Sequence, residues 1–223
     1  MSEDRQAVAG LYGITPEVAN TESLLGIVSQ AISGGARLFQ YRNKSAGRER
    51  LFEQATALRQ LTGEAGARLI INDDFELALR VLADGVHLGQ GDFAGEPAPD
   101  LISAIRRRAL ASGIRSFIVG ISCYDQLEHA IAAETAGATY AAFGSFYPSV
   151  TKPAAIRANP SLIVDAKRQL SLPIVAIGGI TVQNAPELIA AGADALAVVT
   201  ALFNSEDIQS RASAFNALYA NHV

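Results

Sequence analysis

The stretch Pro173-Ile-Val-Ala-Ile177 is apolar at consecutive positions and runs directly into the turn Gly178-Gly-Ile180. A strand that is apolar at every position, instead of at alternate positions, is typical of a parallel sheet with both faces buried. Phe117-Ile-Val119 has the same character. Polar residues follow runs of this kind elsewhere in the chain. The sequence therefore predicts buried parallel strands with polar groups at their carboxyl ends.

Such runs alternate with amphipathic segments about eight times along the chain. Between the runs, apolar residues recur at helical spacing, as Ile208, Ala212 and Phe215 do in the last segment. Eight strand–helix units in 223 residues, with no linker between them, predict one α/β domain over residues 1–223. We expect a closed (β/α)8 TIM barrel and not an open sheet. The expected strands are 11–15, 37–42, 68–72, 85–89, 116–121, 139–144, 173–177 and 195–199.

Two kinds of local signal mark the ends of the expected helices. Glycine tolerates the left-handed conformation that often ends a helix. We therefore expect helix ends at Gly34-Gly35, Gly66, Gly85, Gly113, Gly137 and Gly192. Asp125 and Glu128 have the spacing of a capping box, which predicts a helix that starts at Asp125.

Composition excludes several classes of function. No apolar run approaches the roughly 18 residues that a membrane span needs, and the polar start Met1-Ser-Glu-Asp-Arg5 is unlike a secretion signal. The net charge is −4, and no basic run exceeds Arg106-Arg-Arg108, so we expect no nucleic-acid partner. The single cysteine gives no disulfide framework. We expect a cytoplasmic protein with small-molecule partners, and a homo-oligomer stays open.

The second unit carries an amide and two cations at alternate positions. Gln40, Arg42 and Lys44 would share one face of a strand, while Phe39 and Tyr41 take the other. Cations inside a barrel are costly unless an anion meets them, so this pattern predicts an anion site. The alternative is that Arg42 and Lys44 already lie beyond the strand end, in solvent.

The third and fourth units end in carboxylates. Asp73 follows the strand that ends at Asn72, and Asp92 closes the next unit. Adjacent strands lie about 5 Å apart, so two carboxylates at their ends can share a hard cation such as Mg²⁺. Asp74 is open to a second interpretation as a helix cap. His87 is expected to be a hydrogen-bonded core group and not a metal ligand, because the three histidines are scattered.

The later units suggest a phosphate site. Ser149, Thr151 and Lys152 lie in a loop of hydroxyls and prolines, although an ordinary exposed loop would look similar. Barrels often bind phosphate with the loops after strands seven and eight. Here those loops begin with Gly178-Gly179 and with Val199-Thr200. Ser122 adds a hydroxyl after the fifth strand, whereas Cys123 reads as an inert small apolar residue.

Taken in order, these motifs resemble the thiamine-phosphate synthase family over about residues 10 to 205. The motifs are Gln40-Tyr-Arg-Asn-Lys44, Asn72-Asp-Asp74, His87-Leu-Gly-Gln-Gly-Asp92, Gly120-Ile-Ser122, Pro148-Ser-Val-Thr-Lys-Pro153, Gly178-Gly-Ile180 and Val198-Val-Thr200. Each motif is weak alone, but seven in the same order are specific. The sequence has Ser149 where the family more often has Thr, and Thr200 where it more often has Ser. Both exchanges keep a hydroxyl.

The resemblance implies a transferase that joins the pyrimidine diphosphate and thiazole phosphate halves of thiamine phosphate and releases pyrophosphate. It implies that Asp73 and Asp92 hold Mg²⁺, and that catalysis involves Arg42, Lys44, Lys152 and Ser122. The pyrimidine diphosphate would contact Gln40, Arg42, Lys44, Asn72 and Lys152, and Ser122 would be a further substrate-binding hydroxyl in the mouth. The thiazole phosphate would contact Ser149, Thr151, Gly179, Val199 and Thr200.

Two other functions are compatible with parts of this pattern. A thiazole tautomerase shares the superfamily, but it uses a histidine just after the fifth strand, where this chain has Tyr124. A non-catalytic module that captures thiamine precursors would not need the carboxylates or Lys152. A sugar-phosphate epimerase would share the Gly178-Gly179 loop but would need histidine metal ligands that the sequence lacks.

Overall fold

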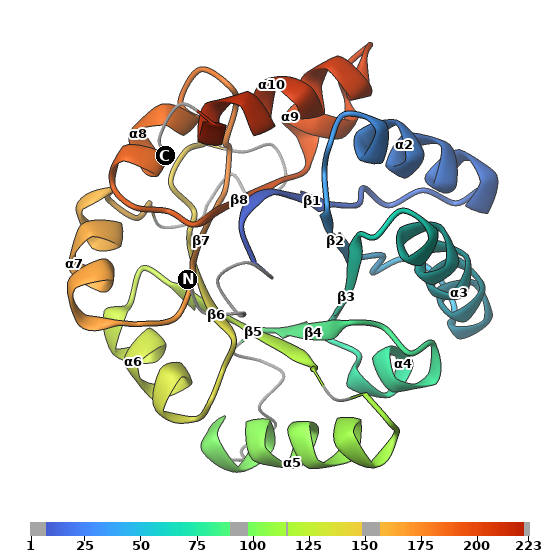
Figure 1. The fold of residues 1–223 in the computed structure, drawn as a ribbon, viewed down its shortest axis with the longest axis horizontal. Helices are drawn as coiled ribbons and strands as arrows, with labels where there is room; N and C mark the ends of the chain where they lie inside the picture. The colour runs from blue at the N-terminus through green and yellow to red at the C-terminus, as the bar shows by residue number, and fades with distance from the viewer. Residues whose placement is uncertain (1–7, 90–97, 115, 149–156, 221–223) are drawn as a thin grey trace.

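The protein is a closed barrel of eight parallel strands, seen down its axis in Figure 1. The computed structural model describes residues 8–89, 98–114, 116–148 and 157–220. Each strand pairs with its neighbours in sequence order, and β1 closes the ring by pairing with β8. The strands are β1 (Gly10–Ile14), β2 (Leu38–Tyr41), β3 (Arg68–Asn72), β4 (Gly85–Leu88), β5 (Ile118–Tyr124), β6 (Tyr140–Gly144), β7 (Ile174–Ile177) and β8 (Ala195–Val198).

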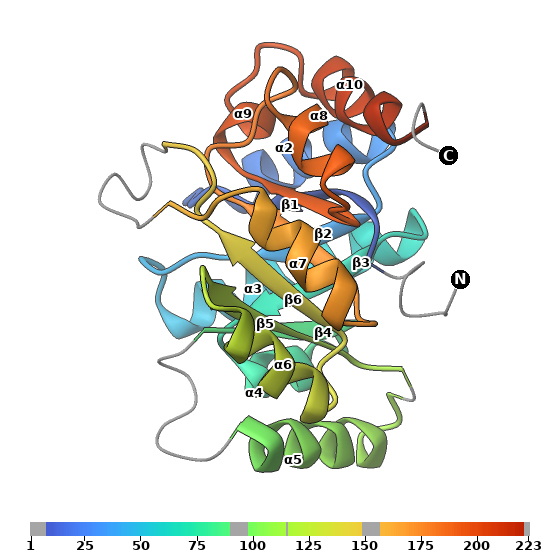
Figure 2. The ribbon, with the colours of Figure 1, turned by 90° about the vertical axis from the view of Figure 1, so that its left-hand side faces the viewer.

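Helices surround the barrel and return the chain from the end of one strand to the start of the next (Figure 1). They are α2 (Thr21–Ser33), α3 (Arg48–Glu64), α4 (Phe75–Arg80), α5 (Ala98–Ala111), α6 (Leu127–Thr135), α7 (Ser161–Gln169), α8 (Ala185–Ala190), α9 (Thr200–Phe203) and α10 (Ile208–Ala220). In Figure 2 the arrow of β6 points to the left, so the carboxyl ends of the strands face the left-hand side of that view. No helix within the described ranges is long and apolar enough to cross a membrane.

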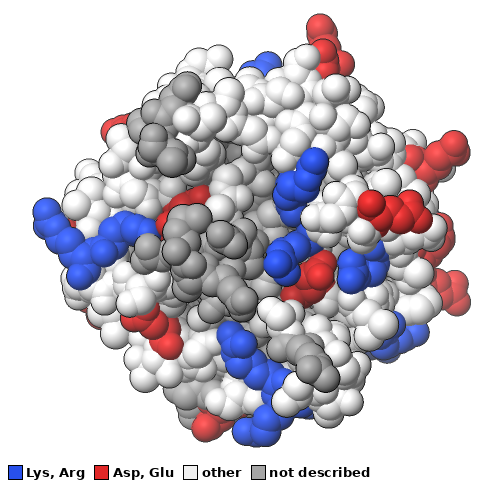
Figure 3. All heavy atoms as spheres, viewed as in Figure 1, with Lys and Arg blue, Asp and Glu red and all other residues white. Residues whose placement is uncertain are grey.

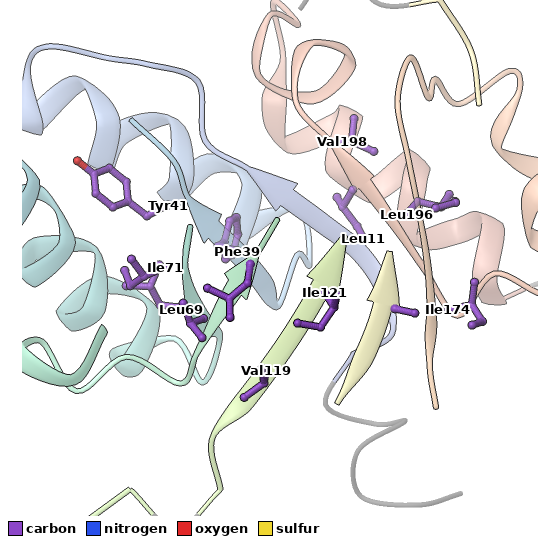
Figure 4. Close-up of a cluster of buried hydrophobic side chains, with 14 of the residues drawn as sticks. Leu11, Phe39, Tyr41, Leu69, Ile71, Val119, Ile121, Ile174, Leu196 and Val198 are labelled. Carbon is purple, nitrogen blue, oxygen red and sulfur yellow. The ribbon is translucent and has the colours of Figure 1, made fainter. Parts of the chain in front are cut away.

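Two apolar cores lie on opposite sides of the strands. Alternate residues, among them Phe39 and Tyr41 of β2 and Leu69 and Ile71 of β3, pack outward against the helices (Figure 4). The residues between them fill the barrel interior, for example Leu38, Ile70, Val175 and Ala197. Because both faces are buried, the strands are apolar at consecutive positions, as predicted.

The predicted (β/α)8 barrel is confirmed, and most strand ends lie within one or two residues of their expected positions. Two local predictions are wrong. Gly85 is the first residue of β4 and not a helix end: a Cβ there would lie 2.2 Å from the carbonyl oxygen of Ile118, so close strand packing accounts for the glycine. Helix α6 begins at Leu127, its N-cap is Gln126, and no side chain caps it.

At the amino end of the barrel, two aspartate carboxylates hold strands in place by accepting hydrogen bonds from their backbone N–H groups. The carboxylate of Asp194 accepts hydrogen bonds from the backbone N–H of Ile174 (2.7 Å) and from Lys167 (2.8 Å). Asp84 accepts from the N–H of Leu69 (2.8 Å) in the same way. Figure 3 shows this end of the molecule, where positive and negative side chains are interspersed and do not form a large area of one sign.

Candidate active site

The end of β2 supplies an amide and two cations to the carboxyl face of the barrel. Gln40 is buried and points inward. The strand ends at Tyr41, so Arg42 and Lys44 lie in the following loop. The prediction that Gln40, Arg42 and Lys44 share one face of a strand is therefore wrong, because only Gln40 lies in the strand. The backbone N–H of Arg42 donates to the hydroxyl of Thr15 (3.1 Å), which holds the start of the loop against the end of β1.

Each of these cations is paired with a carboxylate. The Arg42 guanidinium lies 3.4 Å from Glu17, and only 27% of its side chain is exposed. Lys44 Nζ lies 3.5 Å from Asp73 Oδ2, and 60% of its side chain is exposed. The alternative that these cations lie in solvent beyond the strand end thus describes Lys44 better than Arg42. The pKa of Glu17 is lowered, first by a hydrogen bond from the Ser45 side chain and further by the charge of Arg42.

The end of β3 places Asn72 and Asp73 beside Lys44. Asn72 is the last residue of the strand, and Asp73 has a left-handed backbone (φ 62°) with its N–H bonded to the carbonyl oxygen of His87 (2.8 Å). This turn fixes Asp73 between β3 and β4. Asp74 caps α4 by accepting from the N–H of Leu77 (2.8 Å), so its interpretation as a helix cap is confirmed.

A hollow of about 320 Å³ opens at this part of the rim. Lys44, Asn72 and Asp73 line its polar side, and Leu51 and Ile71 belong to its apolar side. A cation from the loop after β2 and the amide and carboxylate at the end of β3 therefore border one cavity.

Ser122 reaches the interior from β5 and is hydrogen bonded to His87. Its Oγ lies 2.9 Å from His87 Nε2, and His87 Nδ1 lies 2.8 Å from the phenol oxygen of Tyr140. His87 is buried, as expected for a core group. The neighbouring Cys123 is also buried, and burial raises the pKa of its thiol to about 12, which agrees with an inert role.

The loops after β7 and β8 present backbone to the same face. Gly179 has φ 63°, and a Cβ on it would lie 2.3 Å from the carbonyl oxygen of Pro148. Only glycine permits this close approach of the two loops. Asn184 donates to the carbonyl oxygen of Gly179 (3.1 Å) and so fastens the turn. Val199 precedes the short helix α9, whose first residue is Thr200.

The remaining predicted site residues, Asp92, Ser149, Thr151 and Lys152, lie outside the described residues. Within the described part of the chain, no three or more His, Cys, Asp or Glu residues form a group that could hold a metal. Of the two predicted Mg²⁺ ligands, the described structure thus places Asp73 alone. The metal assignment stays a prediction.

Sequence reasoning missed two tyrosines in the barrel interior. Tyr12 and Tyr140 are buried, and their phenol oxygens lie 2.9 Å apart. Gln40 Nε2 donates to the phenol of Tyr12 (3.0 Å). Burial raises the pKa of both phenols well above their ordinary value. Both residues stand in expected strands, so strand parity could have placed them inside once the inward face was known.

Comparison with known proteins gives one consistent result. A family model described as thiamine monophosphate synthase matches residues 11–202. The thiamine-phosphate synthase of Thiobacillus denitrificans is 48% identical over 211 residues, which cover 95% of each chain. That of Azoarcus sp. is 46% identical over 215 residues, which cover 96% of this chain and 99% of the relative. A solved structure of thiamine phosphate pyrophosphorylase from Pyrococcus furiosus, 31% identical, aligns with TM-score 0.80 over 97% of this chain and 98% of its own. The chain belongs to the thiamine monophosphate synthase family.

Proposed function

We propose that the chain condenses 4-amino-5-hydroxymethyl-2-methylpyrimidine diphosphate with 4-methyl-5-(2-hydroxyethyl)thiazole phosphate. The bond between the pyrimidine methylene carbon and the diphosphate oxygen breaks, and the thiazole nitrogen bonds to that carbon. The products are thiamine phosphate and pyrophosphate. Membership of the family, across residues 11–202, supports this reaction. The substrates are small molecules, and the work of the site is to bind both of them at one face.

The observation that carries the proposal is the gathering of cations and polar groups at the carboxyl end of β2 and β3. Arg42, Lys44, Asn72 and Asp73 come from these adjacent strands and the loops that follow them. A departing diphosphate carries concentrated negative charge, and Arg42 and Lys44 would stabilise it as the bond breaks. In the structure both cations face carboxylates, so an incoming diphosphate would replace or share those partners.

No general base is needed for this reaction. The thiazole nitrogen attacks with a lone pair and carries no proton to be removed. The positive charge that develops on the pyrimidine methylene makes leaving-group stabilisation the main catalytic requirement. The chemistry thus requires no serine–histidine nucleophile pair. Ser122 would contact the pyrimidine substrate as a hydrogen-bonding hydroxyl.

The chemistry of Asp73 supports the proposal of a magnesium ion at this site. Asp73 is fixed by its left-handed turn at the rim of the cavity, its side chain is 35% exposed, and its carboxylate is a hard oxygen donor of the kind that Mg²⁺ prefers. Asp73 and Asp92 would hold the ion. When bound, Mg²⁺ would neutralise charge on the diphosphate.

The phosphate of the thiazole substrate would lie against the loops after β7 and β8. Gly179 keeps the backbone of the first loop open to close approach, and Val199 and Thr200 begin the second. Loops after the seventh and eighth strands are a common phosphate site in TIM barrels. Ser149, Thr151 and Lys152 would complete this part of the mouth. We further propose that the protein works in the cytoplasm, for which its single, buried cysteine is support.

The test is product formation by the purified chain. The protein is mixed with Mg²⁺ and both phosphorylated halves, and thiamine phosphate and pyrophosphate are quantified by chromatography. Equal amounts of the two products are expected, with loss of turnover when Mg²⁺ is removed by a chelator and recovery when it is restored. Asp92→Ala and Lys152→Ala should lower the rate of the chemical step in single-turnover experiments. Absence of thiamine phosphate under these conditions would refute the proposed reaction.

A further inference from the structure

Five polar residues form a continuous hydrogen-bonded chain through the otherwise apolar barrel interior. Gln40 Nε2 is 3.0 Å from the phenol oxygen of Tyr12, which is 2.9 Å from that of Tyr140. Tyr140 is 2.8 Å from His87 Nδ1, and His87 Nε2 is 2.9 Å from Ser122 Oγ. The chain begins and ends at residues that we assign to the pyrimidine substrate. Its three middle members have no role in the proposed reaction so far.

The direction of this chain follows from its first member. The Gln40 amide nitrogen can only donate, so the phenol oxygen of Tyr12 accepts. Tyr12 then gives its own proton to Tyr140, and Tyr140 gives its proton to His87 Nδ1. Each phenol has one proton to give because burial keeps it protonated. A neutral His87 ring that accepts at Nδ1 carries its proton on Nε2.

The last hydrogen bond is thereby also oriented. The Nε2–H of His87 donates to Ser122 Oγ, so the Ser122 proton does not point back to the ring and remains to be donated to another acceptor. If every hydrogen bond ran in the opposite direction, Tyr12 would donate to Gln40, and the amide oxygen of Gln40 would have to face Tyr12 in place of Nε2.

The geometry of the barrel supports a dedicated arrangement. The Tyr140 and His87 rings are stacked, with centroids 5.6 Å apart, and Tyr12 meets Tyr140 edge to face at 6.0 Å. Gly120 leaves the space that the Tyr140 ring occupies, since a Cβ there would lie 2.0 Å from Tyr140 Cζ. Buried hydrogen-bonded groups of this kind have one low-energy arrangement, because any member that turns away leaves a partner unsatisfied.

We propose that Tyr12, Tyr140 and His87 are positioning residues that orient the Ser122 hydroxyl as a donor toward the pyrimidine diphosphate, an inference that rests on the proposed function. They touch neither substrate. They act by directing the hydroxyl proton of Ser122 toward the mouth of the barrel. Through the hydrogen bonds between them, this direction depends on the orientation of the Gln40 amide on the other side of the barrel.

The first test uses NMR of the His87 ring and needs no activity. Substitution of His129 and His222 by Gln leaves His87 as the single histidine of the three in the sequence. Long-range ¹H–¹⁵N correlation of this otherwise unaltered chain then reports the protonation of each ring nitrogen. A neutral ring with the proton on Nε2 is expected. A proton on Nδ1, or on both nitrogens, would overturn the proposal.

The second test is a double-mutant cycle in single-turnover kinetics. Tyr140→Phe removes the donor to His87 Nδ1, and the rate should fall about three- to tenfold, as expected for one buried hydrogen bond. In a Ser122→Ala background the same substitution should change the rate by less than about twofold, because its effect passes through Ser122. An equal fall in both backgrounds would show that Tyr140 is merely structural.

The control is Thr62→Val. Thr62 is a buried residue of α3 whose hydroxyl donates to the carbonyl oxygen of Leu58 (2.9 Å) on the outer side of the barrel. The substitution removes a comparable hydrogen bond outside the hydrogen-bonded chain of the barrel interior, and the single-turnover rate should stay within about twofold of the parent. If Ser122→Ala alone leaves the rate unchanged, the assigned role of Ser122 in the proposed function fails. The NMR experiment still decides the direction of the hydrogen bonds in that case.

Discussion

Gly120→Ala is the substitution whose effect the structure specifies most closely. An added Cβ would lie 2.0 Å from Tyr140 Cζ and 2.3 Å from its phenol oxygen, whereas carbon atoms in contact prefer about 3.5–4.0 Å. Either Tyr140 or β5 must therefore move by about 1.5 Å. Overpacking of this kind costs about 1–3 kcal/mol. Displacing the phenol also weakens its hydrogen bonds to Tyr12 and His87, at about 1 kcal/mol each.

We expect Gly120→Ala to lower the free energy of unfolding by about 3–5 kcal/mol, a large part of the stability of an ordinary domain. Urea unfolding followed by circular dichroism measures this change. Gly26→Ala is the matched control, because nothing lies within 4 Å of a Cβ at that position of α2. It should stabilise the protein by about 0.5–1 kcal/mol. If Gly120→Ala unfolds at the same urea concentration as the parent or the control, the placement of Tyr140 is wrong.

Three further outcomes are expected. Asp194→Ala removes the partner of Lys167 and of a backbone N–H of β7, and should lower the free energy of unfolding in urea by about 1–3 kcal/mol. An unchanged unfolding midpoint would contradict it. Cys123, with its raised pKa of about 12, should resist iodoacetamide at pH 8 in the folded protein and react once urea unfolds it, as mass spectrometry would record. Rapid labelling without urea would refute its burial. The pKa of Glu17 is lowered in the folded state, so its stabilising interactions are present above the ordinary carboxyl pKa and are lost as pH falls through the folded value. Parent and Glu17→Gln should therefore differ in stability near pH 7 and converge in acid, and a constant difference from about pH 7 to about pH 3 would contradict this.

The barrel itself could be predicted because its strands can be recognised in the sequence as short runs of apolar residues. A strand buried on both faces is apolar throughout, as at Ile174–Ile177, and local glycines with positive φ, such as Gly137 and Gly192, end the preceding helices as expected. Order along the chain then fixes the neighbours, since each strand of a (β/α)8 barrel pairs with the next. The carboxyl-end location of Gln40, Asn72 and Asp73 followed from the same reasoning.

Features that depend on exact strand length or on contacts across the barrel could not be predicted. The alternation of Gln40, Arg42 and Lys44 resembles a strand, but β2 ends at Tyr41. The loop that follows is hydrogen bonded through the N–H of Arg42 to Thr15, at the end of the neighbouring strand β1. Gly85 resembled a helix end because sequence does not reveal the carbonyl group that would collide with a side chain.

The hydrogen-bonded interior escaped sequence reasoning for a related reason. Tyr12 and Tyr140 are 128 positions apart and carry no motif of their own. A tyrosine in an apolar run is ordinarily a core residue. Only the closed barrel brings the two phenols together with His87, and only their mutual contacts distinguish them from Tyr41 on the outer side.

The most direct test of a diphosphate site at the carboxyl end compares two arginines at opposite ends of the barrel in rapid-quench single-turnover kinetics. Arg42→Ala removes a partly buried cation at the carboxyl end, while Arg168→Ala removes one in the last turn of α7 whose side chain is 73% exposed. If the carboxyl end holds the departing diphosphate, the rate constant of carbon–nitrogen bond formation should fall at least about tenfold in Arg42→Ala and stay within about twofold of the parent in Arg168→Ala. Equal rate constants in the two variants would contradict a diphosphate site at the carboxyl end.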